Sequence, residues 1–302
     1  MSILVEDINK LKEEKNAVIL AHYYVNDDVQ EIADYIGDSY YLSKVAKDLK
    51  EDVIVFAGVS FMGESAKLLS PNKTVLMPDM SADCAMAHMV KLGKIKEMRE
   101  KYEDLAVVCY INSTAEIKTY ADVCVTSANA VKIVKNLPNK NIFFIPDGNL
   151  GRYVAEQVPD KNVILNDGCC PVHAVQTKQD VLEATSKYPN AEFVVHPECT
   201  KELLDEASYI GSTSGIIDYV TNSDCEEFII GTEDGVFYEL KKKNPHKKFY
   251  KLNDRFVCQD MKLVTLEKIK NVLENMDNQV EVADAVREKA LRPLENMLKL
   301  AK

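Results

Sequence analysis

Residues 53–84 read VIVFAGVSFMGESAKLLSPNKTVLMPDMSADC, and this stretch carries the pattern that decides the fold. An apolar run is followed by a turn with glycine, a helical stretch, a Pro-x-Lys stop signal, a second apolar run, an aspartate and a cysteine. The plan returns 88 and then 86 residues later, as NIFFIPDGNLGRYVAEQVPDKNVILNDGCC (141–170) and EFIIGTEDGVFYELKKKNPHKKFYKLNDRFVC (227–258). Self-similarity at a fixed period indicates a repeated structural unit.

Each of the three segments is preceded by another apolar run that ends in polar residues. These runs are NAVILAHYY (16–24), LAVVCYINS (105–113) and AEFVVHPEC (191–199). Continuous apolar runs are typical of parallel strands that are covered by helices on both faces. We therefore predict an α/β fold of three similar αβα units with mainly parallel sheets. If these units pack with pseudo-threefold symmetry, their sheets are arranged around a central site.

The repeat also predicts how the chain is divided. Three α/β repeats are expected at residues 14–86, 87–172 and 173–260. The terminal segments, 1–13 and 261–302, are expected to be helical and to pack on the core. Within the second of these, Pro293 is expected to restart or kink the last helix.

Composition and charge exclude several classes of protein. The net charge is −11, and only five of the 37 basic residues are arginine, which argues against a nucleic-acid partner. No apolar run approaches the ~18 residues of a membrane span, and the charged N-terminal sequence is unlike a secretory signal. A cytoplasmic protein is expected. The sequence does not fix its oligomeric state, and a monomer is compatible with it.

Three of the eight cysteines follow the repeat: Cys84, Cys170 and Cys258 close the second strand of each copy. Ligands of parallel α/β sheets bind beyond the carboxyl ends of the strands, so three thiolates are expected to converge there. Zinc with a water, or a [4Fe–4S] cluster with one open iron, fits three such ligands. The all-sulfur set favours the cluster. Three unrelated buried thiols are the alternative, and Cys169 competes with Cys170 as a ligand.

Polar residues recur at the same ends of the strands. His22, Tyr110 and His196 are separated by 88 and 86 residues, and Ser39, Ser127 and Thr213 repeat these intervals. A hydroxyl at a helix start either caps the helix or helps to hold an anion. Tyr24 and Asn112 lie two positions beyond the first set, as does Glu198. His88 and His246 fall outside the pattern and are expected on the surface.

An open iron is a Lewis acid, which suits condensation and dehydration of a small anionic substrate. Because arginine is scarce, such a substrate is expected to be held by hydroxyls, imidazoles and helix N-termini. Three other functions remain open: a hydro-lyase with an open cluster iron, a zinc enzyme, and a binding protein with buried thiols and no metal.

The residues in these motifs resemble those of the quinolinate synthase family. The resemblance covers nearly the whole chain. The matching stretches are AHYYVNDDVQEIADYIGDS (21–39), SADCAMA (81–87), YINS (110–113), GCCPVH (168–173), VHPEC (195–199), GSTSG (211–215) and the cysteine at 258.

The resemblance implies three similar α/β domains around one [4Fe–4S] cluster per chain, held by three cysteines with the fourth iron open to substrate. It implies a transferase that condenses iminoaspartate (iminosuccinate) with dihydroxyacetone phosphate to quinolinate, with loss of phosphate and two waters, in the de novo synthesis of NAD. An aspartate-oxidising enzyme that supplies iminoaspartate is the implied protein partner.

The resemblance also implies roles for individual residues. The cluster ligands are then Cys84, Cys170 and Cys258, and the catalytic residues are Glu198, Tyr110, Tyr24 and His22. The substrate-binding residues are His22, Ser39, Tyr110, Ile111, Asn112, Ser127, His173, His196, Pro197, Glu198, Ser212 and Thr213. The extra cysteine at 169 is the one departure from the family pattern.

Overall fold

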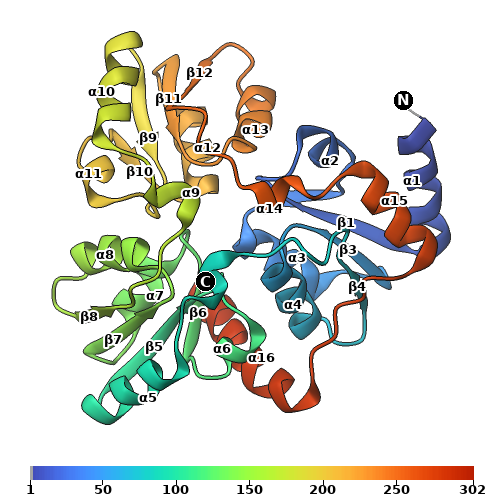
Figure 1. The fold of residues 1–302 in the computed structure, drawn as a ribbon, viewed down its shortest axis with the longest axis horizontal. Coiled ribbons are helices and arrows are strands. Elements are labelled where there is room, and N and C mark those ends of the chain that lie inside the picture. The colour runs from blue at the N-terminus through green and yellow to red at the C-terminus, as the bar shows by residue number, and fades with distance from the viewer. Residues whose placement is uncertain (1–2) are drawn as a thin grey trace. The chain divides into compact units, whose positions relative to one another are not determined.

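Three four-stranded sheets share one strand order in the computed structural model, which describes residues 3–302. In each sheet the second strand along the chain lies at one edge and is followed by the first, third and fourth (Figure 1). The first sheet contains β2 (Tyr35–Gly37), β1 (Ala17–His22), β3 (Val53–Ala57) and β4 (Thr74–Leu76). The second contains β6 (Val123–Val125), β5 (Leu105–Tyr110), β7 (Asn141–Ile145) and β8 (Asn162–Leu165). The third contains β10 (Tyr209–Ile210), β9 (Glu192–Val195), β11 (Glu227–Gly231) and β12 (Lys248–Lys251).

The parallel pairing has the same register in all three sheets. Between the first and third strands, partners lie 36 residues apart: Ala17 with Val53, Leu105 with Asn141, and Glu192 with Phe228. Between the third and fourth strands they lie 21 apart: Val53 with Thr74, Asn141 with Asn162, and Glu227 with Lys248. The α/β fold of three similar units is therefore confirmed. The symmetry around a central site and the repeat boundaries stay predictions.

Contacts within the fold group the chain into two compact units. Unit 1 consists of Met1–His88, Ile111–Cys124 and Gln259–Lys302, and unit 2 consists of Met89–Tyr110 and Val125–Cys258. The first sheet belongs to unit 1. The third sheet and strands β5, β7 and β8 of the second belong to unit 2.

The helices of unit 1 include both terminal segments of the chain. They are α1 (Ile3–Lys15), α2 (Asp27–Ile32), α3 (Ser39–Asp48), α4 (Ser60–Leu69), the 3-10 helix η1 (Ala85–His88), α6 (Ala115–Lys118), α14 (Gln259–Lys262), α15 (Leu266–Asn275) and α16 (Asp284–Leu300). The N-terminal helix α1 packs against α15, and α16 packs against α4 and α6 (Figure 1). Helices therefore lie at both ends of the described residues, and the predicted bounds of the terminal segments stay predictions.

Pro293 does not restart the last helix, and this part of the sequence-based expectation is wrong. Helix α16 runs from Asp284 to Leu300 with the proline inside it. Pro293 lies on the buried face, with Ala290 before it and Leu294 after it. Burial of this apolar face stabilises the helix and offsets the backbone hydrogen bond that proline cannot donate.

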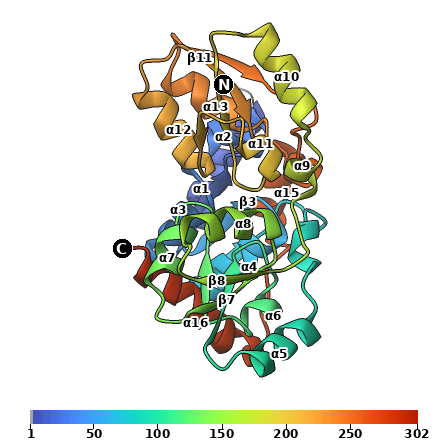
Figure 2. The same cartoon turned by 90° about the vertical axis from the view of Figure 1, so that its left-hand side faces the viewer.

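Unit 2 carries the helices that surround the second and third sheets (Figure 2). They are α5 (Leu92–Lys101), α7 (Ala130–Asn136), α8 (Gly148–Gln157), α9 (Pro171–Ala174), α10 (Lys178–Lys187), α11 (Lys201–Leu204), α12 (Thr213–Asn222) and α13 (Val236–Lys243). Among residues 3–302, no helix combines the length and the apolar character needed to cross a membrane.

The Pro-x-Lys signals end the helices as expected, and their lysines have a structural role. Helices α4, α8 and α13 each end two residues before the proline of the signal. The ammonium groups of Lys73, Lys161 and Lys247 donate to backbone carbonyls at or just beyond the C-terminal ends of α3, α7 and α12, the helices that precede the third strand of each sheet. Cations at helix C-termini satisfy carbonyls that have no partner within the helix. The Pro-x-Lys motif therefore specifies the turn after α4, α8 and α13 and not the candidate active site.

Thr177→Ala is expected to destabilise unit 2 by about 1 kcal/mol, because it removes the N-cap of α10. The Thr177 hydroxyl accepts from the Asp180 N–H, and the Asp180 carboxylate accepts from the Thr177 N–H in return. Urea unfolding followed by circular dichroism measures the loss. Ser186→Ala, at an exposed position of the same helix, is the control and is expected to change stability by less than about 0.5 kcal/mol. Equal stabilities of the two variants contradict the assignment of the cap.

Candidate active site

Three polar rings lie at the carboxyl ends of the first strands of the three sheets. His22 is the last residue of β1, Tyr110 is the last residue of β5, and His196 directly follows β9. All three side chains are buried, with at most 6% of each residue exposed. Because they end equivalent strands of equivalent sheets, their places in the repeat agree with the sequence prediction.

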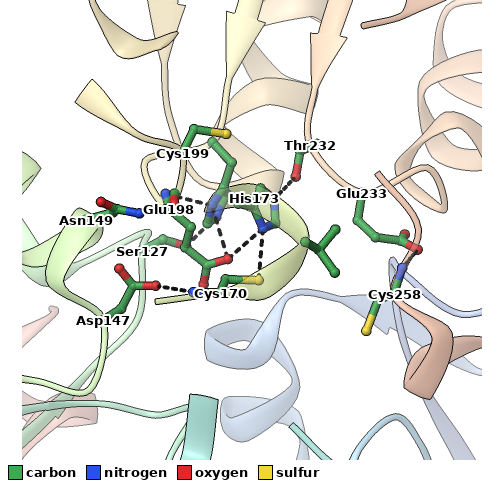
Figure 3. Close-up of polar contacts among 12 residues, drawn as sticks. Ser127, Asp147, Asn149, Cys170, His173, Glu198, Cys199, Thr232, Glu233 and Cys258 are labelled. Carbon is green, nitrogen blue, oxygen red and sulfur yellow. Dashed lines mark hydrogen bonds and ion pairs between the residues drawn. The ribbon is translucent and has the colours of Figure 1, made fainter. Parts of the chain in front are cut away.

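Glu198 is the centre of a buried polar cluster in unit 2 (Figure 3). Its carboxylate Oε2 lies 2.9 Å from Nδ1 of His173 and 3.7 Å from Nδ1 of His196. The hydroxyl of Tyr110 also hydrogen-bonds the carboxylate. Only 3% of Glu198 is exposed, so its charge depends on these partners and not on water.

The GCCPVH motif folds so that His173 faces its own cysteine. Cys170 is the N-cap of α9 and Pro171 is the first helical residue, a position that suits the fixed φ of proline. One turn later, Nδ1 of His173 lies 3.2 Å from Sγ of Cys170. Its Nε2 lies 3.0 Å from Oγ1 of the fully buried Thr232, which follows β11. His173 therefore joins Cys170 to Glu198.

The second imidazole is fixed by a hydroxyl from the second sheet. Nε2 of His196 lies 3.1 Å from Oγ of Ser127, which lies in the turn after β6. Nδ1 of His196 accepts the backbone N–H of Glu198 at 3.3 Å. Both ring nitrogens are thus used, so the ring holds one orientation.

Burial sets the charge state of the cluster. Burial lowers the pKa of His196 to about 3, with a contribution from His173, so His196 is neutral at pH 7. Burial alone raises the pKa of Glu198, but the imidazoles of His196 and His173 and hydrogen bonds from His173 and Tyr110 outweigh it. The pKa of Glu198 therefore lies below its ordinary value. Among these partners, His173 and the Tyr110 hydroxyl also hydrogen-bond the carboxylate and so favour its ionised form.

Asp147 is a site residue that the sequence analysis did not single out. It is fully buried, and burial together with the nearby Glu198 carboxylate raises its pKa to about 8, against three backbone N–H groups that lower it. Oδ1 of Asp147 accepts from Leu150 N–H at 2.8 Å and caps α8, while Oδ2 accepts from Cys170 N–H at 3.2 Å. The next residue but one, Asn149, donates from its side chain to the Glu198 carbonyl at 3.1 Å.

Two glycines bring the cysteine loop close to Asp147. Asp147 and Gly168 form a parallel β-bridge, and Gly148 N–H donates to the Gly168 carbonyl at 2.7 Å. A Cβ atom on Gly168 would lie 2.5 Å from the Pro146 carbonyl oxygen, closer than a side chain permits. Glycine at this position therefore allows the approach that puts Cys170 over the aspartate.

Unit 1 carries a similar loop after its first strand. Nδ1 of His22 accepts Tyr24 N–H at 3.2 Å, as Nδ1 of His196 accepts Glu198 N–H. The ammonium of Lys262 donates to the Tyr24 carbonyl at 2.7 Å, and the buried amide of Gln30 donates to two carbonyls of the loop. Tyr24 thus takes the place in unit 1 that Glu198 takes in unit 2.

The three hydroxyls of the repeat are not helix caps themselves. Ser39 and Thr213 are the first residues of α3 and α12, and the side chains of Asp38 and Ser212 cap those helices. Ser127 lies in the turn before α7, whose N-cap is Asn129. The capping alternative therefore does not apply at these three positions, because the N-caps lie one or two residues away, and the hydroxyls keep their capacity to bind a ligand.

The remaining predicted residues lie beside the strand ends. Ile111 is 1% exposed and Pro197 is buried, so both are part of the core around the polar groups. The side-chain oxygen of Asn112 is buried and has no hydrogen-bond partner. A buried acceptor without a donor is costly, so this oxygen is suited to a ligand.

The cysteines divide by exposure in a way that fits the predicted ligands. All eight are thiols; Cys109, Cys124 and Cys199 are buried, whereas the predicted ligands Cys84, Cys170 and Cys258 are partly exposed, as are Cys169 and Cys225, so exposure alone does not select the ligands. Burial raises the pKa of the Cys199 thiol well above its ordinary value, which disfavours a thiolate ligand there. Ligand atoms of Cys170, His173 and Glu198 lie within 4.8 Å of one another, so this group alone can also hold a metal ion.

Unit 2 therefore brings together six of the predicted residues. These are Tyr110, Ser127, Cys170, His173, His196 and Glu198. Unit 1 carries Cys84, His22, Tyr24, Ser39, Ile111 and Asn112. Convergence of the three cysteines stays a prediction.

Comparison with known proteins gives one consistent result. The family described as Quinolinate synthetase A protein matches residues 6–299. A quinolinate synthase of Clostridioides difficile (strain 630) is 55% identical over 298 residues, which are 99% of this chain and 98% of that protein. A quinolinate synthase of Fusobacterium nucleatum subsp. nucleatum is 57% identical over 294 residues, which are 97% and 98% of the two chains. One of Caldicellulosiruptor saccharolyticus is 50% identical over 295 residues, which are 98% and 97%.

The buried neutral His196 predicts a pH dependence of stability. Its pKa of about 3 in the fold is below the ~6.5 of an unfolded chain, so the unfolded state gains a proton as pH falls below ~6.5. This imidazole therefore costs up to about 1.4 kcal/mol of stability for each pH unit below ~6.5. The expected result for His196→Gln is a shallower loss of stability between about pH 6.5 and pH 4.5, measured by urea unfolding at several pH values. Parallel slopes for the variant and the wild type contradict the neutral buried state.

Proposed function

Because this chain belongs to the quinolinate synthetase A family, we propose that it is a transferase that condenses iminoaspartate with dihydroxyacetone phosphate to quinolinate, with loss of phosphate and two waters. Quinolinate synthases are enzymes, and the family implies an iron–sulfur cluster. The observation that carries the proposal is the buried Glu198 carboxylate, held ionised by His173 and Tyr110 at the end of a parallel sheet. A base at such a position suits the proton transfers of a condensation and two dehydrations.

The thiols fit one [4Fe–4S] cluster per chain, with Cys84, Cys170 and Cys258 as ligands. These three are partly exposed thiols at equivalent places after the fourth strand of each sheet. Three thiolates leave one iron open, and when bound the cluster supplies a Lewis acid for a carboxylate or a departing hydroxyl. His173 and Glu198 lie close to Cys170, so both residues would lie near a cluster held by that cysteine.

The proton transfers are assigned to four side chains. Glu198 accepts a proton as general base and returns it as general acid during tautomerisation and dehydration. Its hydrogen bond to Tyr110 provides a direct route for that proton. Tyr24 and His22 assist from the equivalent loop of unit 1, where the same backbone geometry holds them.

The substrate anions are bound without arginine. Hydroxyls of Ser39, Ser127, Ser212 and Thr213 and the imidazoles of His173 and His196 donate to carboxylate or phosphate oxygens. The buried oxygen of Asn112 accepts a substrate hydroxyl or N–H, and Ile111 and Pro197 are proposed as apolar contacts of the substrate. The scarcity of arginine agrees with this choice of donors.

The proposal also covers the arrangement of the three sheets, the reactions before and after this one, and the location of the enzyme. The equal registers of the three sheets support a pseudo-threefold arrangement around the cluster. The product leads to NAD, and an aspartate-oxidising enzyme supplies iminoaspartate. The reaction uses small molecules without nucleic acid or membrane, in the cytoplasm.

Glu198→Gln is expected to keep the visible absorption of the cluster and to lower quinolinate formation by at least about 100-fold, because glutamine cannot accept the proton. Quinolinate is measured after incubation of the anaerobic enzyme with both substrates. Glu202→Gln, four residues on at an exposed position of α11, is the matched control and should retain wild-type turnover. Substantial turnover by Glu198→Gln contradicts the proposal that the Glu198 carboxylate is the general base.

Alanine substitution of Cys84, Cys170 or Cys258 is expected to abolish the brown colour of anaerobically reconstituted protein, because two thiolates no longer hold the cluster. Cys169→Ala is the neighbouring control and is expected to keep the colour. The visible spectrum distinguishes the variants. A coloured Cys170→Ala together with a colourless Cys169→Ala reverses the assignment of that pair.

A further inference from the structure

A carboxylate accepts the backbone N–H of each of the three cysteines proposed as ligands. Oδ1 of Asp83 lies 2.8 Å from Cys84 N, and Oδ2 of Asp147 lies 3.2 Å from Cys170 N. Oε1 of Glu233 lies 3.1 Å from Cys258 N. No sequence motif indicates these contacts, because two of the three acidic residues lie far from their cysteine along the sequence.

Asp147 and Glu233 occupy the same place in two repeats. They are 86 residues apart, and each is the second residue after the third strand of its sheet. Neither has any exposed surface. Each uses its other oxygen on its own turn, Asp147 for Leu150 N–H at 2.8 Å and Glu233 for Gly235 N–H at 2.7 Å. Both carboxylates therefore tie the turn after the third strand to the cysteine after the fourth.

In the first repeat, a residue at a different position makes the same contact. The equivalent position after β3 is Val59, which has no side-chain acceptor. There the carboxylate comes from Asp83, the neighbour of the cysteine, and it is fixed by the hydroxyl of Ser60 and by Nε2 of His88 at 2.6 Å. All three cysteines therefore have this contact, although the acidic residue comes from a different place in the first repeat. The contact belongs to the cysteine position and not to one particular turn.

We propose that Asp83, Asp147 and Glu233 are positioning residues that fix the backbone of the three ligand cysteines before the cluster is bound. Groups that orient metal ligands commonly change metal affinity 10–100-fold when they are removed. The inference rests on the proposed assignment of the cysteine ligands.

Two variants test the contact without removing the turn. Asp147→Ser keeps an oxygen that can cap α8, because serine is a good N-cap, but it has no second oxygen for Cys170. Glu233→Val places at this turn the residue that the first repeat carries there, at Val59. Thr177→Ala is the control, since it weakens a helix of the same unit without touching a cysteine.

The measurement is the rate at which the anaerobic, reconstituted protein gives up iron to a ferrous chelator, followed by loss of visible absorption. Asp147→Ser and Glu233→Val are expected to release iron about 10–100-fold faster than the wild type, and Thr177→Ala at the wild-type rate. Release within twofold of the wild type from folded variants overturns the proposal. Faster release from Thr177→Ala as well also overturns it, because general destabilisation then explains the effect.

Hydrogen exchange in the wild-type chain without the cluster covers the case in which the variants do not fold. The amides of Cys170 and Cys258 are expected to exchange at least tenfold more slowly than that of Cys169, because a buried carboxylate holds each of them. Exchange of all three at the same rate overturns the proposal. If the reconstituted wild type binds no cluster at all, the proposed function fails, whereas the exchange result still decides whether the carboxylates fix the backbone.

Discussion

The parallel register of the three sheets is the constraint on which the rest of the structure depends. Partners on the first and third strands lie 36 residues apart in every sheet, and partners on the third and fourth strands lie 21 apart. A slip of one residue would turn each buried side chain to the opposite face, so the apolar runs hold the register firmly. Because the register is the same, residues at equivalent places in the sequence arrive at equivalent ends of strands. The histidines, the tyrosine and the cysteines of the candidate site all come from such places.

The second determinant is the burial of acidic groups. Glu198 and Asp147 are both buried in unit 2, and their pKa values move in opposite directions. Hydrogen bonds from His173 and Tyr110 favour the ionised form of Glu198, whereas burial and the nearby Glu198 charge raise the pKa of Asp147 against three backbone N–H groups that lower it. A protein without these partners would neutralise Glu198 instead.

Much of the fold and part of the site could be predicted from the sequence, and physical reasons explain the rest. Intervals of 88 and 86 residues identify the repeated strands, and intervals of 86 and 88 residues between Cys84, Cys170 and Cys258 select Cys170 over the core thiols Cys109 and Cys124. They could not reveal Asp147, because an aspartate before a helix reads as an ordinary cap, and it is one. They could not reveal Thr232 either, since its partner His173 is 59 residues away. The continuity of α16 through Pro293 depends on packing, which local sequence does not encode.

The most direct test of the central claim is the iron and acid-labile sulfide content of the wild-type chain purified without oxygen. Three thiolates that hold a cubic cluster predict about four iron and about four sulfide per chain, with little zinc. Stoichiometric zinc without sulfide, or protein with no metal at all, contradicts the account, because the thiols would then serve another purpose.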